Sequence, residues 1–409
     1  MATIDKSLPN TMTEVEIPGE EEIVEAKEEA VEEISSDGQT EIEMDEEGGA
    51  TINFDPGEVN PEGGEDHDAN LADFLEDNVL DPLASELMEK YTNYKQSRQE
   101  WADSYREGLN LLGFKYVTRT EPFRGASSVT HPVLAEAVTQ FQAQAYKELL
   151  PADGPVRTQI MGDANVAKEE QSKRVKDFMN YQIMDQMKEY EPEFDQMLFY
   201  LPLSGSTFKK VYYDDLLGRA VSKFIPAEDL VVPYSATSLE DAEAVIHVIR
   251  MSPNDLRKQQ INGFYRDIDL GEPPVQEDKL KQKELELEGI SSNGTEDMYT
   301  ILEMHVDVDL EGHEDVNPED GEPTGIKLPY IITIDEANEK VLSIRRNYAP
   351  EDPLKKKKDY FVHFKFLPGL GFYGLGLIHM IGGLSRTATV ALRQLLDAGT
   401  LANLPAGFK

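Results

Sequence analysis

Three glycines, Gly369, Gly371 and Gly374, have the spacing best suited to chemistry, because they match the dinucleotide-binding pattern G-x-G-x-x-G. The apolar stretch 361–367 before them predicts a strand, and a helical pattern follows them. In nucleotide-binding folds such glycines let backbone N–H groups and a helix N-terminus hold a pyrophosphate. The preceding strands, however, form a series of hairpins rather than βαβ units. The alternative is that the glycines permit a sharp turn and close packing between a β domain and a helix.

An acidic segment resembles the start of a calcium loop. Residues 307–312 read Asp-Val-Asp-Leu-Glu-Gly, which fits the first half of an EF-hand. The twelfth position of such a loop needs a bidentate glutamate, and here it holds Pro318. The flanking segments also read as strands rather than helices. We therefore predict no EF-hand, and adventitious cation binding to the acidic loop 307–322 remains open.

Two further polar features have structural alternatives. His131 stands alone before a proline, so a hydrogen bond at a helix entry explains it better than catalysis. Residues 355–358 are four lysines, which suit either a solvated turn or a contact with phosphate or a partner. No Ser/His/Asp set, no paired carboxylates and no GxxxxGK[ST] loop occur. We therefore expect no enzyme activity, no cofactor and no metal.

Acidic residues dominate the composition. The 409 residues carry a net charge of −40, of which residues 1–80 contribute −24 from 26 acidic and two basic side chains. A chain this acidic does not coat DNA through phosphate contacts, although it can surround DNA without gripping it. There is no cysteine, no signal peptide and no apolar run long enough to span a membrane.

The periodicity predicts an α+β fold. Helical stripes occur between positions 71 and 200, and β-rich hairpins occupy most of the chain from 206 to 366. We expect four regions: a disordered acidic tail (1–80), a helical part (81–198), an antiparallel β-rich domain with an insertion at 271–298 (199–368), and a glycine-rich turn with a long helix (369–409).

The last predicted helix has two distinct sides. One is a continuous apolar stripe, and the other is polar. An ordinary helix would pack its stripe on its own domain, whereas a helix in a ring would pack against copies of itself with its polar side toward a channel. On the second interpretation the subunit-packing candidates are Leu384, Ala388, Leu392 and Leu395, and the channel-lining candidates are Arg386, Thr389, Arg393 and Asp397.

Several blocks of the sequence resemble one family. The closest block runs from the glycine turn into the last helix, with HFKFLPGLGFYGLG followed by ALRQLLDAGTLANLPAGF. Others are FRGASSVTHP, which precedes a helix closed by Leu-Pro, and SPNDLRKQQINGFYRDI. A further block is the predicted hairpin within residues 199–236. The residues that match the family there are Ser204, Gly205, Phe208, Gly218, Arg219, Pro226, Glu228, Asp229 and Pro233. Over roughly residues 100–409 the chain resembles the portal proteins of tailed bacteriophages, the head-to-tail connectors.

The resemblance implies a function. Portal subunits form a ring, usually a dodecamer, at one capsid vertex, and the β-rich region here would be their wing. Double-stranded DNA passes through the ring non-specifically during packaging and ejection. Terminase large subunit, capsid and scaffold proteins and a tail adaptor are the expected partners, with no membrane. The location would be the virion, and the host cytoplasm during assembly. The long helix within 369–409 would be the first stem helix of the portal. The clip, second stem helix and crown would follow it, so we expect an N-terminal portion of such a protein.

Two alternatives stay open beside the portal prediction. One is a nucleotide-binding enzyme that uses the loop of Gly369, Gly371 and Gly374. The other is an acidic scaffold or DNA-mimic protein, which depends on residues 1–80.

Overall fold

The chain consists of two units, Met1–His67 and Asp68–Lys409. The computed structural model describes residues 41–44, 50–53, 67–114, 118–162, 165–214, 217–273, 279–288, 298–316, 324–369 and 371–403. In the first unit β1 (Glu41–Met44) pairs with β2 (Ala50–Asn53) in antiparallel register. The predicted disorder of the acidic tail otherwise falls, up to residue 66, outside the described residues.

Residues 68–80 belong to the folded second unit, which differs from the expected boundary at 80. Leu71 and Ala72 in the short helix η1 (Leu71–Asp73) are fully buried. The side chain of Asn70 accepts a hydrogen bond from the backbone N–H of Ile344 at 2.9 Å. Two apolar residues are too few to show helical periodicity. The prediction of disorder up to residue 80 therefore depended on the acidic composition around them.

The helices of the second unit largely follow the predicted stripes. The long stripe from 80 to 109 is two helices, because the chain bends at Arg98. The guanidinium of Arg98 is buried and donates to the backbone carbonyls of Ala227 and Leu230, at 2.7 and 2.9 Å. The helical elements up to the first large strand are α2 (Asp77–Ser97), α3 (Gln99–Leu109), η2 (Asn110–Leu112), α4 (Val133–Leu149), α5 (Val166–Tyr181), η3 (Gln182–Gln186) and α6 (Tyr190–Ser204).

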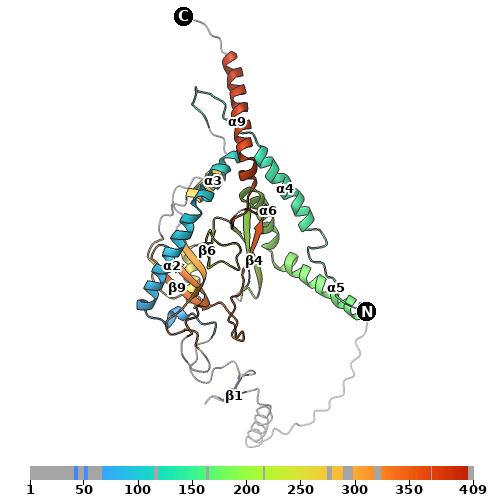
Figure 1. Cartoon of the computed structure of the whole chain (residues 1–409). Helices are drawn as coiled ribbons and strands as arrows, with labels where there is room; N and C mark the ends of the chain where they lie inside the picture. Colours follow the sequence, from blue (N-terminus) through green and yellow to red (C-terminus); the bar gives the residue numbers. More distant parts are fainter. Residues whose placement is uncertain are drawn as a thin grey trace, which may run out of the picture. The chain divides into compact units, whose positions relative to one another are not determined.

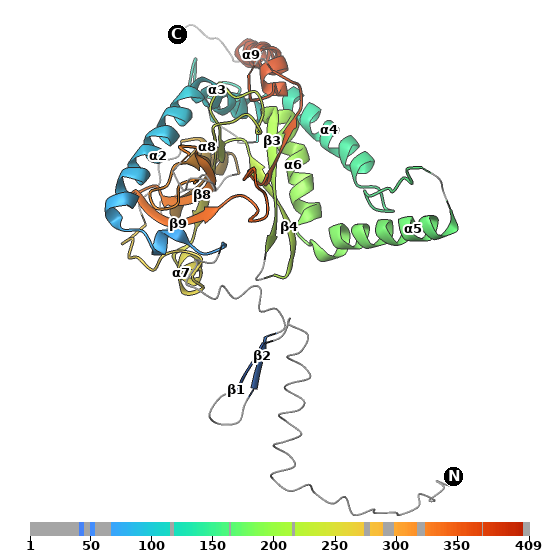
Figure 2. The same ribbon diagram turned by 60° about the horizontal axis from the view of Figure 1, so that its bottom comes forward.

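A five-stranded antiparallel sheet forms the larger core. Its strand order is β5-β6-β7-β8-β9, and α2 packs on it, as Figures 1 and 2 both show. Alternating apolar residues of β7 and β8, such as Leu302 and Ile332, meet the stripe of α2 that contains Leu80 and Leu87. The strands are β5 (Leu230–Val231), β6 (Ala244–Met251), β7 (Tyr299–Val308), β8 (Leu328–Asp335) and β9 (Lys340–Arg346).

Two helices lie in the connections of this sheet. α7 (Pro253–Ile261) is capped by Ser252, whose hydroxyl accepts from the N–H of Asp255. α8 (Lys279–Glu288) lies inside the predicted insertion 271–298. It is not wholly exposed, because Leu287 packs on the cluster that contains Tyr105 of α3.

The predicted hairpin after α6 is present and forms a second, three-stranded antiparallel sheet of order β10-β3-β4. Its members are β3 (Ser206–Asp214), β4 (Arg219–Pro226) and β10 (Phe361–Lys365). The outer edge of β4 is covered by carboxylates. Glu193 of α6 accepts from the N–H of Phe224 at 2.5 Å, and Glu189 forms a two-point ion pair with Arg219. This cover protects an edge strand from pairing with another chain.

A buried ion pair joins the two sheets. Lys210 of β3 lies 2.5 Å from the carboxylate of Glu303 on β7, and both side chains are 14% exposed. His305 lies 2.9 Å from the same carboxylate. Burial alone would raise the pKa of Glu303, but the charge of Lys210 and the hydrogen bond with His305 hold that pKa well below its usual range. The charges of Lys210 and Glu303 at this junction are therefore paired with each other within one chain.

The architecture confirms the α+β prediction, since helices combine with antiparallel sheets. Among the described residues, no helix is both long and apolar enough to cross a lipid bilayer.

Candidate functional site

The candidate site begins at the turn that leads into the last helix, α9 (Leu377–Ala402). There the chain passes within van der Waals distance of the turn between α6 and β3. A Cβ at Gly374 would overlap the carbonyl oxygen of Gly205, and a Cβ at Gly376 would overlap that of Leu203. The N–H of Gly374 donates to the hydroxyl of Ser206 at 2.7 Å. Glycine is required here because two backbones occupy adjacent space.

This packing bears on the dinucleotide pattern. The backbone of the α6–β3 turn fills the space beside Gly374 that a pyrophosphate would need. The strand before the loop, β10, is an edge of an antiparallel sheet, not part of a parallel one. Both observations favour the mechanical use of the glycines over nucleotide binding.

The polar side of α9 is hydrogen-bonded to the backbone of the same chain. Residues 385, 389, 393 and 397 recur at every fourth position, and three of them bond to segment 127–131. Thr389 accepts from the N–H of His131 at 3.0 Å, and Asp397 accepts from that of Ser127 at 2.6 Å. Arg393 donates from Nε to the carbonyl of Val129 at 2.6 Å. The segment before α4 thus satisfies its backbone groups on α9.

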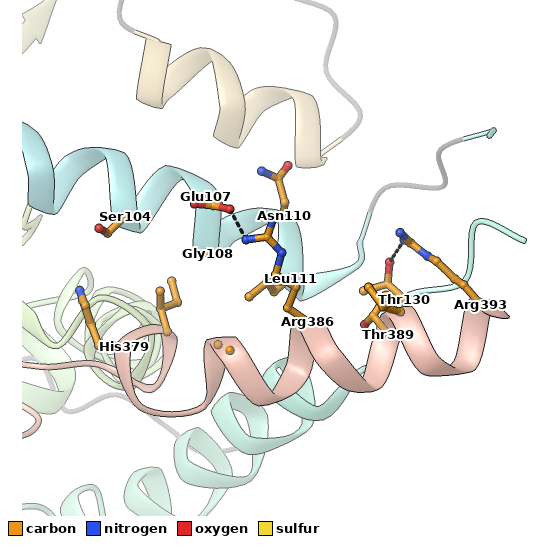
Figure 3. Close-up of a pocket in the computed structure, with 14 residues that line it drawn as sticks. Ser104, Glu107, Gly108, Asn110, Leu111, Thr130, His379, Arg386, Thr389 and Arg393 are labelled. Carbon is orange, nitrogen blue, oxygen red and sulfur yellow. Dashed lines mark hydrogen bonds and ion pairs between the residues drawn. The ribbon is translucent and has the colours of Figure 1, made fainter. Parts of the chain in front are cut away.

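Arg386, the fourth channel-lining candidate, is the most open. Its guanidinium pairs with Glu107 of α3 at 2.7 Å, and the two side chains are 69% and 66% exposed. An ion pair this exposed contributes little to stability. All four candidates therefore lie toward α3 or the 127–131 segment, and Figure 3 shows three of them, Arg386, Thr389 and Arg393.

The subunit-packing candidates lie on the other side of α9. Leu384 and Leu395 are 66% and 72% exposed, and Ala388 and Leu392 are half-buried. Other large apolar side chains of α9 are exposed as well: Met380, Val390, Leu396 and Leu401. Figure 1 shows the C-terminal part of α9 (red) extending beyond both sheets. The helix therefore exposes several large apolar side chains to solvent.

A cavity of about 660 Å³ lies between α3 and α9 (Figure 3). Gly383 adds no side chain to it, and a Cβ there would meet nothing within 4 Å. The polar groups that line it are hydroxyls, an amide, a carboxylate and guanidinium groups. His379 also lines it; burial lowers the pKa of this histidine, and its Nδ1 accepts from the N–H of Gly376 at 3.2 Å. The polar side chains that line it, including Asn110, Thr130 and Arg386, can all form hydrogen bonds with a bound group.

The other sequence motifs have structural uses. The side chain of Lys355, from the lysine run, pairs with Asp315 at 2.5 Å, and Lys357 donates to the carbonyl of Glu240 at 2.8 Å. Within the described part of the acidic loop, and of the chain, no cluster of His, Asp or Glu has the geometry of a metal site. These observations leave α9 and its surroundings as the candidate site.

Sequence reasoning missed the contribution of α3 to this site. Glu107 and Asn110 line the cavity, yet they lie about 270 positions before α9 in the sequence. The one available signal was the four-residue spacing of polar positions on α9, which indicates a polar partner along the whole helix.

The sequence was also compared with known proteins. No protein-family model matches it, and no curated protein matches it.

Proposed function

We propose that this chain is a subunit of a phage portal, forming a ring through which double-stranded DNA passes. The proposal depends on the resemblance of several ordered sequence blocks, and the structural observation that carries it is the exposed apolar side of α9. Leu384 and Leu395 are each about two-thirds exposed or more on a helix whose opposite side is fixed to its own subunit. Burying leucine surface is favourable by roughly 25 cal/mol per Å², so a partner on this side is expected.

A second copy of the chain is the simplest partner for that surface. The opposite side of α9 is covered by its own chain, so the apolar side would contact a different surface of the next copy, and such a contact is head-to-tail. Head-to-tail contacts generate closed rings when the rotation between subunits closes. This is the symmetry that a DNA conduit requires.

The charge distribution suits passage of DNA without retention. Outside residues 1–80 the chain carries −16, and only a few cations lie along α9. Every firm phosphate contact adds salt-dependent affinity, which would slow a moving duplex. In this proposal the subunit makes and breaks no bond itself; terminase supplies the work, and capsid, scaffold and tail proteins bind the ring.

The test is the state of assembly of the full 409-residue chain, measured by native mass spectrometry and negative-stain electron microscopy across a concentration series. We expect rings for the wild type and loss of rings for Leu395→Asp, because the carboxylate would be buried at the contact. Ile261→Asp is the matched control, since Ile261 of α7 is 71% exposed but lies away from α9.

Two results would contradict the proposal. One is an unchanged assembly state in both Leu395→Asp and Leu384→Asp. The other is equal disruption by Ile261→Asp, which would show that any exposed charge change affects assembly.

A further inference from the structure

A second, smaller cavity of about 210 Å³ adjoins the first on the other side of Thr130 and Arg393, which line both. Its walls come from four parts of the chain: η2 with the residue after it, the segment 118–130, α8 and α9. The side chains that matter for its chemistry are Arg119, Lys283, Arg393, Asn110, Ser128 and Thr130.

Positive charge dominates this cavity in a protein whose net charge is −40. Three of its lining residues are cations, and among the described residues none of those that line it is an aspartate or glutamate. Acidic groups lie outside it: Glu286 pairs with Lys283 at 3.1 Å along α8, Asp397 bonds to the N–H of Ser127, and Asp103 and Glu107 line a neighbouring cavity that also contains Lys283. The charge of the side chains that line this cavity is therefore opposite in sign to the net charge of the whole chain.

The two arginines are held in place by backbone carbonyls. Arg119 donates to the carbonyl of Ser127 at 3.2 Å, and Arg393 donates to that of Val129 at 2.6 Å. Burial lowers the pKa of Arg393 and the positive charge of Arg119 lowers it further, while the carboxylate of Asp397 offsets only part of this effect. The two guanidinium groups therefore repel each other, and an anion between them would relieve the repulsion.

Neutral donors complete the lining. Asn110 brings an amide, and Ser128 and Thr130 bring hydroxyls, all of which can donate to an oxyanion. Thr130 already accepts from Arg393 at 3.2 Å, which leaves its own hydroxyl hydrogen free to point elsewhere. The volume is several times the roughly 30 Å³ that one water occupies in the liquid, so a tetrahedral oxyanion fits with its residual water.

We propose that this cavity binds a phosphate group, with the planar forks of Arg119 and Arg393 and the point charge of Lys283 as its cationic partners. Guanidinium groups match phosphate oxygens in two-point geometry, and lysine adds charge without directional demand. The group comes either from a free phosphate or from the phosphodiester backbone of DNA. The inference concerns the cavity alone and does not require that the chain forms a ring.

The experiment titrates the purified full chain with inorganic phosphate by isothermal calorimetry, at constant ionic strength set with chloride. A parallel titration uses a short blunt DNA duplex with 5′-hydroxyl ends, so that only diester phosphates are present. We expect saturable binding in at least one titration, weakened about tenfold or more by Arg119→Gln and by Lys283→Gln, because each removes a charge-assisted contact.

The control variant is Arg386→Gln, which removes a cation from the neighbouring 660 Å³ cavity but not from this one. Circular dichroism and thermal unfolding verify that every variant is folded. Binding of phosphate identifies a free group as the ligand, and binding of the duplex alone identifies the diester. The proposal is overturned if neither titration saturates, or if Arg386→Gln weakens binding as much as Arg119→Gln does.

Discussion

The junction between the two sheets and the last helix both depart from the rule that charges lie outside and leucines inside. At the junction Lys210 and Glu303 are each 14% exposed, and each is the other's partner. On α9, Leu384 and Leu395 are 66% and 72% exposed, while Thr389 on the opposite side is buried. The charges at the junction find their partners within the chain, whereas the leucines on the apolar side of α9 face solvent in the single chain. In the proposed ring, the first group of residues would stabilise the subunit and the second would form the contact between subunits.

The largest effect is expected from breaking the junction. Glu303→Ala would leave the ammonium group of Lys210 buried without its counter-charge, which costs about 3–5 kcal/mol. Urea unfolding of the variant measures the loss. The control is Asp267→Ala, whose ion pair with Arg257 is more than half exposed on both sides and contributes less than about 1 kcal/mol. Equal losses in the two variants would show that burial of the junction is irrelevant.

The next largest loss of stability is expected at low pH, from buried histidines. Burial lowers the pKa of His247 and of His363 to about 3 each, from an ordinary value near 6.5. Between these values the unfolded chain binds protons that the folded chain does not, so stability falls as pH drops below about 6.5. Urea unfolding at pH 7 and at pH 5 should differ by on the order of a few kcal/mol.

The control for this pH dependence is His247→Gln, which removes one of the two buried imidazoles. Its unfolding free energy should change less between pH 7 and pH 5 than that of the wild type. An identical pH dependence in this variant would contradict the assignment to His247.

A smaller loss is expected on the polar side of α9. Thr389→Val keeps the shape of the side chain but removes the oxygen that accepts from the N–H of His131. Leaving that donor without a partner costs about 1–3 kcal/mol. Thr387→Val is the control, because Thr387 is exposed on the same helix and bonds only to the carbonyl of Gly383. Equal stability of the two variants would mean that segment 127–131 does not depend on α9.

The smallest effect on the subunit itself is expected at the apolar side of α9. Leu395→Asp should change the unfolding free energy of the monomer by no more than about 0.5 kcal/mol, since the side chain is 72% exposed. Unfolding is measured at a concentration below assembly. A loss of several kcal/mol would place Leu395 with the junction, as a residue that serves its own fold.

Local pattern was sufficient for most elements. The β-rich composition predicted the hairpin of β3 and β4, and the apolar stripe predicted α9. These features depend only on residues within a few positions of one another, so they can be recognised in the sequence alone. The α+β class follows from the same information.

Tertiary structure decided what local pattern could not express. The break at Arg98 exists because carbonyls about 130 positions later receive its guanidinium, and Leu71 is buried because β9 lies beside it. The sequence by itself determined that α9 has a polar and an apolar side. Which side the subunit covers was decided by segment 127–131, whose backbone groups need partners and find them on Thr389, Arg393 and Asp397.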